Sequence, residues 1–259
     1  MSPERVLVMG IVNVTPDSFS GDGIMAAEAA VARGLALARE GADILDVGGE
    51  STRPGHQPVT DEEEMRRVLP VVEALAGRNL KVSIDTTKRA VAAAALQVGA
   101  RMVNDVWGLQ RSPELAALAA QHRAELVVMH NQEGTHYGQD LMAEIKRSLR
   151  QSLALALAAG QPRERTWVDP GIGFGKLALH NVEVLRRLAE LHELGQPILL
   201  GTSRKSFLER VFGQPLPMRA WGTAATVAAG VLRGVGMVRV HDVKEMVAVV
   251  RVAEALRQP

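Results

Sequence analysis

The amino-acid sequence predicts a (β/α)8 barrel, a ring of eight parallel strands in which a helix follows each strand. Its 259 residues are close to the roughly 250 that are typical of this fold. Six apolar stretches end in a polar residue able to do chemistry, and a helical pattern follows each of them. These stretches are Val8–Asn13, Val82–Asp85, Met102–Asp105, Val127–His130, Trp167–Pro170 and Val238–His241. Catalytic groups of such barrels lie where strands end, all on one face, so the pattern predicts an enzyme.

Strands and helices alternate along the whole chain, as expected of parallel strands joined by crossover helices. We expect strands near residues 5–13, 43–48, 81–85, 101–105, 125–130, 166–169, 197–203 and 237–241. Helices are expected at 25–40, 61–77, 88–98, 112–122, 139–159, 180–194, 204–212, 218–234 and 242–257. A doubly wound open sheet would show the same periodicity, and eight strand–helix units in this length favour the closed barrel.

Local residues support several of these boundaries. Thr60 and Glu63 have the spacing of a capping box that opens the helix at 61–77. Four glycines directly follow helical patterns, where a left-handed backbone favours glycine: Gly41, Gly99, Gly160 and Gly195. The helix at 139–159 carries an apolar stripe that we expect to face the core or an interface. The stripe consists of Leu141, Ile145, Leu149, Leu153 and Leu157.

Composition limits the possible functions. The apolar fraction of 47% and the charged fraction of 23% are those of a globular protein, and we expect one domain over residues 1–259. The net charge of +1 does not point to nucleic acid or to an anionic membrane. No apolar run reaches the roughly 18 residues that a membrane span requires. The chain has no cysteine, which excludes thiolate chemistry and fits a reducing cytoplasm.

Two loops after early strands carry candidate site residues. Loop 1, Asn13–Gly23, is polar and rich in glycine, and the amide oxygen of Asn13 at its base could face a metal ion or a phosphate. Loop 2, Gly48–Gly55, holds Arg53 between hydroxyl residues and a proline. An exposed arginine is ordinarily only a solvated charge, but on this face of a barrel it suits an anion or a developing charge.

A third loop, Asp169–Lys176, follows the sixth predicted strand and is rich in glycine. Its spacing is wrong for a P-loop, because Leu177 stands where that motif needs serine or threonine. The chain also has no GxGxxG motif in a dinucleotide-binding context. We therefore expect the glycines to let the backbone pass close to a flat ligand, with Phe174 as an apolar wall.

The last two strand ends carry cations. Ser203 and Lys205 open a helix after the seventh strand, whereas Arg239 and His241 lie two residues apart on the eighth and point to the same side. Barrels often hold phosphate at these two loops, and a helix start adds N–H donors and a favourable dipole. Each residue alone would be a solvated or structural side chain, but together they predict an anion site.

Three further strand ends carry oxygen-bearing side chains, Asp85, Asn104 and Asp169. A carboxylate that faces a barrel mouth has to be solvated, paired or bound to a ligand. Two carboxylates and an amide can read the edge of a heterocycle with several N–H donors, such as a 2-aminopyrimidinone. A general acid–base pair is the alternative, and a site made only of metal ligands is disfavoured because the histidines are few and scattered.

With these residues in place, the chain resembles the dihydropteroate synthase family over nearly its whole length. The resemblance rests on seven strings that occur in order at the expected strand ends. They are NVTPDSFS at 13–20, GGESTRPG at 48–55, SIDT at 83–86, VND at 103–105, DPGIGFGK at 169–176, SRKS at 203–206 and RVHDV at 239–243. One such string would be weak evidence, whereas seven at the right strand ends are highly specific.

The resemblance implies a TIM barrel that condenses 6-hydroxymethyl-7,8-dihydropterin diphosphate with 4-aminobenzoate, with Mg²⁺ required. The products are 7,8-dihydropteroate and pyrophosphate, in folate synthesis. By the family pattern the pterin diphosphate is bound by Thr52, Asp85, Asn104, Asp169, Lys205, Arg239 and His241, with Asn13 binding Mg²⁺. The aminobenzoate pocket is bordered by Phe19, Thr52, Arg53, Pro54, Phe174, Lys205 and Ser206. The expected catalytic residues are Arg53, Lys205 and Arg239.

Two segments depart from the family pattern. Loop 1 more often reads SFSDGG, whereas the segment Ser20–Gly23 places its aspartate one position later, so Asp22 receives no role. The segment His130–His136 differs from the commoner MHMQG form, and we assign it no catalytic residue.

Two other functions would share the pterin-reading carboxylates and amide. A pterin-binding methyltransferase domain that serves a corrinoid protein would have no need of the diphosphate-binding Arg239 and His241. A non-catalytic relative would not be expected to keep Asn13, Arg53 and Lys205 intact. The resemblance also implies a homodimer whose ligands are small molecules, with no nucleic acid or membrane partner.

Overall fold

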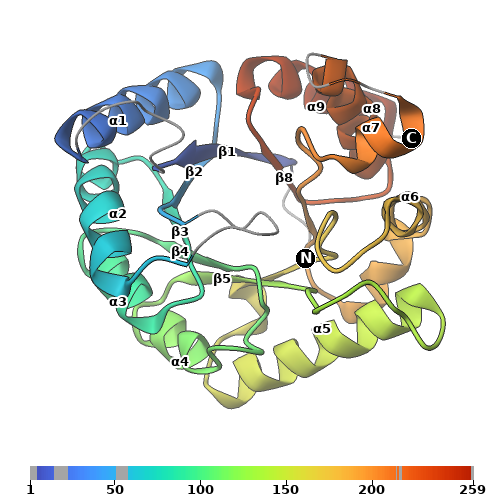
Figure 1. Ribbon diagram of the computed structural model, residues 1–259, viewed down its shortest axis with the longest axis horizontal. Helices are drawn as coiled ribbons and strands as arrows, with labels where there is room; N and C mark the ends of the chain where they lie inside the picture. Colours follow the sequence, from blue (N-terminus) through green and yellow to red (C-terminus); the bar gives the residue numbers. More distant parts are fainter. Residues whose placement is uncertain (1–4, 15–22, 51–57, 214, 216–217, 258–259) are drawn as a thin grey trace.

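The strands of the computed structural model form one parallel sheet that curls into a barrel, with helices packed around its outside (Figure 1). The structure describes residues 5–14, 23–50, 58–213, 215 and 218–257. Within these residues the strands are β1 (Leu7–Asn13), β2 (Ile44–Gly48), β3 (Val82–Asp85), β4 (Met102–Asp105), β5 (Glu125–Met129), β6 (Thr166–Asp169), β7 (Leu199–Leu200) and β8 (Met237–Val240).

The order of these strands closes a ring. Hydrogen-bonded neighbours run β6-β5-β4-β3-β2-β1-β8-β7, and a parallel bridge between Val168 of β6 and Ile198, just before β7, joins the two ends. Each strand therefore lies beside its neighbours in sequence, and the first lies beside the last. The (β/α)8 barrel is confirmed, and the open doubly wound sheet is excluded.

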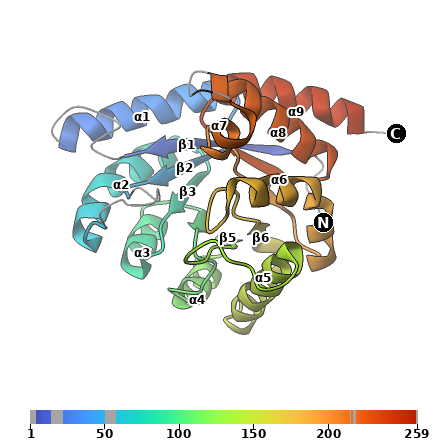
Figure 2. The ribbon, with the colours of Figure 1, turned by 45° about the vertical axis from the view of Figure 1, so that its right-hand side comes forward.

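The helices form the outer layer, as the turned view in Figure 2 also shows. They are α1 (Gly23–Glu40), α2 (Asp61–Ala76), α3 (Arg89–Gln97), α4 (Glu114–Gln121), α5 (Leu141–Ala158), α6 (Ala178–Arg186), α7 (Phe207–Phe212), α8 (Arg219–Leu232) and α9 (Val243–Arg257), with the 3₁₀ helices η2 (Arg163–Arg165) and η3 (Leu188–Leu194). No helix of the described residues combines the length and the apolar character that crossing a bilayer demands.

The interior of the barrel is a packed apolar plug, because one buried side chain enters it from almost every strand. These residues are Met9, Ile44, Met102, Val127, Trp167, Leu199 and Met237. A larger cluster fills the space between the outer face of the strands and the helices. Burying each large side chain contributes about 1.5–3 kcal/mol, so the plug forms a firm floor beneath the barrel mouth.

The predicted helix caps are largely confirmed. The Thr60 hydroxyl accepts a hydrogen bond from the backbone N–H of Glu63 at 3.2 Å, as an N-cap residue does. The reciprocal half of the predicted capping box is wrong, because the Glu63 carboxylate instead bonds Arg66 and Arg67. The four glycines predicted to follow helices all have positive φ: Gly41, Gly99, Gly160 and Gly195.

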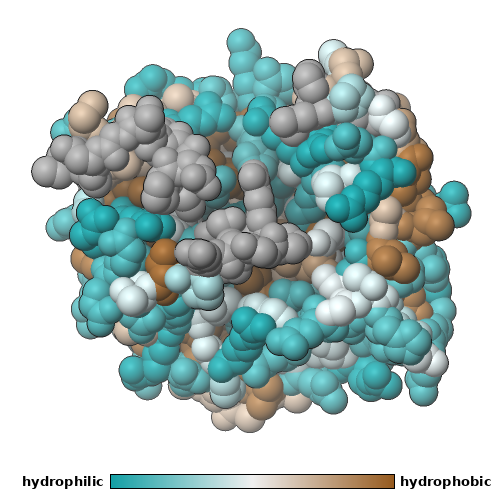
Figure 3. Space-filling view, viewed as in Figure 1, coloured by the Kyte–Doolittle hydropathy of each residue, from teal (hydrophilic) through white to brown (hydrophobic). Residues whose placement is uncertain are grey.

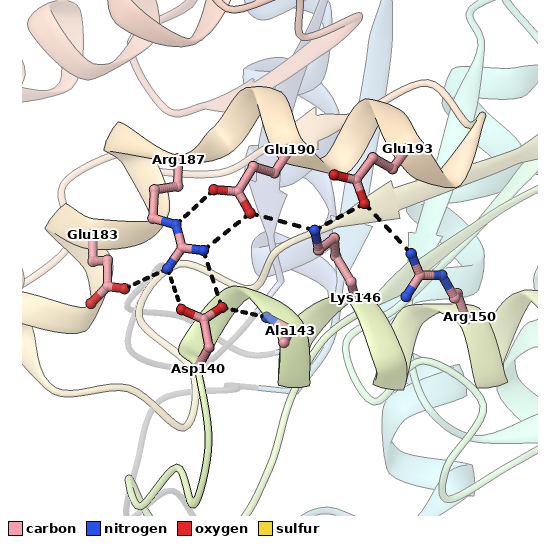
Figure 4. A network of polar contacts seen from close by, with 8 residues as sticks. All are labelled: Asp140, Ala143, Lys146, Arg150, Glu183, Arg187, Glu190 and Glu193. Carbon is pink, nitrogen blue, oxygen red and sulfur yellow. Dashed lines mark hydrogen bonds and ion pairs between the residues drawn. The ribbon is translucent and has the colours of Figure 1, made fainter.

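One predicted helix is in fact two. The expected helix at 180–194 ends as α6 at residue 186 and continues as η3 after Arg187. A 3₁₀ helix has three residues per turn, so Glu190 and Glu193 share a face, and both carboxylates reach Lys146 Nζ of α5, at 3.4 Å and 3.0 Å (Figure 4). Arg187 itself bonds Asp140, which caps α5. These contacts stabilise the break in the helix.

The seventh strand is much shorter than predicted. Only Leu199 and Leu200 pair, where a strand over 197–203 was expected. Pro197 has no N–H to donate, although its carbonyl oxygen accepts from Val168 N at 3.1 Å. After Leu200 the backbone leaves the sheet at once, and the loop so formed carries the residues predicted to bind an anion.

The apolar stripe on α5 packs on the core over only part of its length. Its first residues Leu141, Ile145 and Leu149 are buried, Leu153 is half-buried and Leu157 is exposed. The N-terminal part of the helix therefore packs on the core, and its end faces outward.

Candidate active site

The residues of the plug also determine which polar side chains face the barrel mouth. Side chains alternate along a strand, so a residue two positions after an inward-facing one also points inward. Ile44, Met102, Trp167 and Met237 of the plug are followed two residues later by Asp46, Asn104, Asp169 and Arg239. The sequence thus places four polar groups directly above an apolar floor.

Arg239 is the centre of a buried ionic cluster. Its Nε donates to Asp46 Oδ2 at 2.6 Å, and its Nη2 donates to Asp85 Oδ2, also at 2.6 Å. Asp46 Oδ2 also accepts from Asn104 Nδ2 at 2.9 Å. The second oxygen of each carboxylate, Oδ1 of Asp46 and of Asp85, is buried without a hydrogen-bond partner. The cluster therefore has acceptor capacity that a ligand with N–H groups could use.

The charges of this cluster are set by burial and by each other. Burial raises the pKa of Asp85 to about 7, although Arg239 opposes the rise. Burial also disfavours the charge of Arg239, but Asp46 and Asp85 outweigh it, and the pKa of the guanidinium is raised. Arg239 is therefore a permanent cation, whereas the proton on Asp85 responds to small changes near neutral pH.

Asp169 and Lys205 face each other across the ends of β6 and β7. Asp169 Oδ1 accepts from the backbone N–H of Gly171 at 2.7 Å, and Lys205 Nζ donates to the carbonyl oxygen of Ile172. A side-chain carbon at Gly201 would lie 3.9 Å from Asp169 Oδ2 and 4.0 Å from Lys205 Nζ. Gly201 therefore lies beside both charged groups, at ordinary contact distance.

Burial shifts both of these groups toward their neutral forms. It lowers the pKa of Lys205 to about 8, against the attraction of Asp169, and it raises the pKa of Asp169, against Lys205. Lys205 Nζ also lies 4.5 Å from the centre of the Phe174 ring, a cation–π distance. An aromatic wall and a cation thus share one pocket.

His241 is held by Ser203. The Ser203 Oγ lies 2.9 Å from His241 Nδ1 and accepts from the His241 backbone N–H at 3.1 Å. Because Oγ already accepts from the backbone, its own hydrogen can go to Nδ1. The predicted anion-site residues after β7 and β8 are therefore joined to one another.

A cleft of about 930 Å³ opens at these strand ends. Its lining includes the predicted site residues Asp85, Phe174 and Ser206, together with Lys176 of the loop after β6. Ligand sites in proteins commonly have volumes of about 300–1,000 Å³, so the cleft has room for two aromatic substrates.

Asn13 ends β1 and is exposed. It pairs in register with Gly48, which pairs in register with Asp85, so Asn13 stands at the same level of the mouth. The described part of the chain holds no group of three or more histidine, aspartate or glutamate side chains that could bind a metal ion. A single amide oxygen suits Mg²⁺, which usually takes few protein ligands and completes its shell with water and substrate phosphates.

The matching family model, for pterin binding enzymes, covers residues 9–241. The dihydropteroate synthase of Bacillus subtilis (strain 168) is 42% identical over 98% of this chain and 89% of its own length. That of Synechocystis sp. is 44% identical over 98% of this chain and 91% of its own length. The chain belongs to the dihydropteroate synthase family.

Solved dihydropteroate synthases have the same fold. A structure from Clostridium difficile, determined in the presence of pteroic acid, has a TM-score of 0.96 and 46% identity and covers 100% of this chain and 99% of its own. The Xanthomonas albilineans enzyme in complex with 7,8-dihydropteroate has a TM-score of 0.90 and 43% identity, over 99% of this chain and 95% of its own. At these identities the likeness extends to the family as well as the fold.

Several residues of the dihydropteroate synthase pattern lie outside the described part of the chain. Phe19 and Asp22 of loop 1 and Thr52, Arg53 and Pro54 of loop 2 are among them. The structure brings the remaining ones together: Asp85, Asn104 and Arg239 in one cluster, Asp169, Phe174 and Lys205 in a second, His241 with Ser203, and Ser206 on the cleft wall.

Asp46 is the site residue that the sequence reasoning missed. It stands inside β2 among apolar neighbours, whereas the pattern that marks candidate residues lies at strand ends. A fully buried carboxylate within an apolar strand needs a partner, and that need could have identified it. The buried pair His130 and Lys176, at 2.8 Å, was likewise not recognised.

Replacing Asp46 with alanine is expected to weaken binding of the pterin diphosphate by about 1–3 kcal/mol, because Asn104 Nδ2 and Arg239 Nε would lose a buried acceptor. Titration calorimetry measures this loss. Asp43→Ala removes a carboxylate that directly precedes β2, where it accepts from Val8 N, and is expected to leave affinity unchanged. Equal losses in both variants would contradict a specific role for Asp46.

Proposed function

We propose that this chain is a dihydropteroate synthase that condenses 6-hydroxymethyl-7,8-dihydropterin diphosphate with 4-aminobenzoate, releasing pyrophosphate and forming 7,8-dihydropteroate. One observation carries the proposal. A set of acceptors suited to a heterocycle edge lies in the same barrel mouth as a set of cations suited to a diphosphate, in a chain with full-length relatives of this name. The reaction serves folate synthesis.

The acceptors would bind the pterin. The Asp169 carboxylate can accept two N–H bonds from the 2-amino group and ring N–H, a charge-assisted bidentate pair. Asn104 offers an amide, and the partnerless Oδ1 of Asp85 offers a further acceptor. Arg239 lies against both acidic groups of the cluster, where its flat guanidinium would stack on the ring.

The cations would stabilise the leaving group. As the exocyclic C–O bond breaks, the electron pair stays with the diphosphate, and negative charge grows beside Arg239 and His241. We propose that Asn13 holds Mg²⁺ here; when bound, Mg²⁺ neutralises phosphate charge. The positive charge left on the exocyclic carbon spreads into the dihydropterin ring, as the dissociative course proposed for the family requires.

The second pocket would hold 4-aminobenzoate between Phe174, Lys205 and Ser206, with Arg53 and Pro54 from loop 2. The nitrogen lone pair of the arylamine attacks the exocyclic carbon, a C–N bond forms, and the amine then loses a proton. Phe19, Thr52 and the rest of loops 1 and 2 are proposed to keep water from the cation. No covalent nucleophile is needed, consistent with a chain that has no cysteine.

The test is formation of dihydropteroate from the two substrates, with and without Mg²⁺. Mg²⁺-dependent product is the expected result. A protein that binds the pterin at micromolar concentration but makes no product would instead favour the methyltransferase domain or the non-catalytic relative, and the next step would be a search for a partner protein.

Replacing Arg53 with alanine is expected to lower turnover while binding of the pterin diphosphate survives, because its role is proposed for the second substrate. Steady-state kinetics with calorimetry separate the two effects. Loss of pterin diphosphate binding in this variant would instead assign Arg53 to the first substrate.

We further propose that the enzyme is a cytoplasmic homodimer. Apolar surface gathers beside α6 to α8 (Figure 3). Exposed large apolar side chains of these helices and of the residues directly before them include Leu177, Leu179, Phe212, Met218 and Trp221. Exposed apolar patches of this kind often mark protein–protein contacts. Sedimentation that finds only monomer at micromolar concentration would contradict the dimer, and cell fractionation tests the location.

A further inference from the structure

Lys176 is a buried lysine without a carboxylate partner among its hydrogen bonds. Its Nζ lies 2.8 Å from His130 Nδ1, 3.0 Å from the Gly171 carbonyl oxygen and 3.1 Å from that of Phe174. A lysine ammonium has three hydrogens, so these three acceptors satisfy it completely. Buried lysines are rare and normally paired with acids, which suggests that this one serves the groups it binds.

Those groups belong to two loops of the mouth. His130 follows β5, whereas Gly171 and Phe174 belong to the loop after β6 that separates the two proposed substrate pockets. The ends of this loop contact the pterin side through Asp169, which accepts from Gly171 N at 2.7 Å. Its middle, at Ile172, accepts a hydrogen bond from Lys205. Lys176 therefore holds the segment that places both the Phe174 ring and the Lys205 ammonium.

The loop has little room to adopt another position. Gly171 has φ of +70°, and a Cβ built there would lie 1.9 Å from the His130 carbonyl oxygen and 3.3 Å from Lys176 Nζ. The backbone of the loop after β6 thus packs directly against the residue that follows β5, and the Lys176 amine occupies the space beside this contact. Loss of the amine would leave His130 Nδ1 and the Phe174 carbonyl oxygen without this donor, whereas the Gly171 carbonyl oxygen would keep only the backbone N–H of Phe174, at 3.1 Å.

The protonation states fit this arrangement. Burial and the charge of Lys176 lower the pKa of His130 to about 3, so its ring is neutral and Nδ1 can accept. Burial lowers the pKa of Lys176 to about 7, opposed by Asp169 and supported by Lys205. Even as a neutral amine, Lys176 would keep two N–H donors for the two carbonyl oxygens.

We propose that Lys176 is a positioning residue for the second substrate: by joining His130 to the Gly171–Phe174 loop, it sets the place of Phe174 and Lys205 in the aminobenzoate pocket. This inference rests on the proposed function. It separates Lys176 from Lys205, since the first joins His130 to the carbonyl oxygens of Gly171 and Phe174. The second bonds the Ile172 carbonyl oxygen and lies against the Phe174 ring. His130 gains a role as the acceptor that anchors the lysine to β5.

The test compares Lys176→Met with Lys146→Met, which removes a partly buried lysine amine that joins α5 to Glu190 and Glu193 of η3. The KM for 4-aminobenzoate is expected to rise roughly 10–100-fold in Lys176→Met, the scale on which small misplacements act. Calorimetric affinity for the pterin diphosphate alone is expected to stay within about threefold of wild type, because Asp85 and Asn104 keep their partners Arg239 and Asp46. Lys146→Met should change neither quantity.

Two variants of His130 test whether the acceptor for Lys176 is what matters. Asparagine can place its side-chain oxygen near the position of Nδ1, so His130→Asn is expected to keep a KM close to wild type. His130→Leu removes the acceptor and should raise the KM in the same direction as Lys176→Met. In the double variant Lys176→Met/His130→Leu the effects should not add, because both break one interaction.

An unchanged KM in folded Lys176→Met would overturn the proposal, as would equal losses of aminobenzoate and pterin affinity. The wild-type assay distinguishes a failure of the positioning role from a failure of the proposed function. A wild-type protein that makes no product contradicts only the proposed function. Hydrogen exchange at residues 171–174 then still tests the positioning role. Faster exchange in Lys176→Met than in Lys146→Met supports it, and equal exchange contradicts it.

Discussion

Replacing Arg239 with methionine is expected to lower kcat by roughly 10²–10³, the usual effect of removing a donor from a developing negative charge. The guanidinium is held at 2.6 Å by both Asp46 and Asp85, so it is already oriented before the diphosphate begins to leave. Methionine keeps the volume of the side chain but supplies neither charge nor hydrogen bonds. Single-turnover measurement of dihydropteroate formation detects the change without a contribution from product release.

Removal of Arg239 also leaves two buried carboxylates without their cation, which destabilises a fold by about 3–5 kcal/mol. Arg239→Lys therefore accompanies it, since lysine keeps the charge but cannot bridge both aspartates. We expect Arg239→Lys to fold and still lose most of kcat. Arg204→Met, which removes an exposed arginine paired with Asp242, is the control for charge near the mouth. A kcat near wild type in folded Arg239→Lys would show that a positive charge suffices and that the two bonds of the guanidinium are not needed, and a kcat near wild type in folded Arg239→Met would remove Arg239 from the reaction.

Replacing Asp169 with asparagine is expected to weaken binding of the pterin diphosphate by about 2–5 kcal/mol, because an amide nitrogen would face a ligand donor. The loss is not offset elsewhere, since Oδ1 is already used by Gly171 N at 2.7 Å. Titration calorimetry with the pterin diphosphate alone measures it. Asp105→Asn is the control. Asp105 is similarly buried, but its carboxylate accepts from the backbone N–H groups of Trp107 and Leu109. Unchanged affinity in Asp169→Asn would remove this residue from the pterin site.

Strand ends were the most predictable part of this molecule. An apolar run that stops at a polar residue marks both the end of a strand and a side chain at the mouth, so Asp85, Asn104 and Asp169 could be placed without coordinates. Periodicity could not show how far β7 continues, because the backbone leaves the sheet after Leu200 for reasons that depend on the next loop. Nor could it show that the helix near Arg187 changes to 3₁₀ geometry, which depends on charges contributed by α5.

The interior partners were beyond the reach of sequence patterns. Asp46 accepts a hydrogen bond from Arg239, which lies 193 positions later in the chain. Lys176, after β6, contacts His130, after β5. A motif shows which residues recur in one segment, whereas these contacts depend on how separate strands are staggered around the ring. Residues that position others are therefore harder to recognise in a sequence than residues that face the ligand.

The bridge between Val168 and Ile198 is the only pairing that closes the ring between β6 and the start of β7 in the described part of the chain. Asp169 lies on the β6 side of this pairing and Lys205 follows β7 on the other side. A pterin bound by both residues would therefore join the two sides of the barrel wall where it has the fewest backbone hydrogen bonds. Opening of the barrel wall at this place and dissociation of the ligand are then linked. The lifetime of the complex depends on how often the wall opens locally as well as on the contacts between ligand and protein.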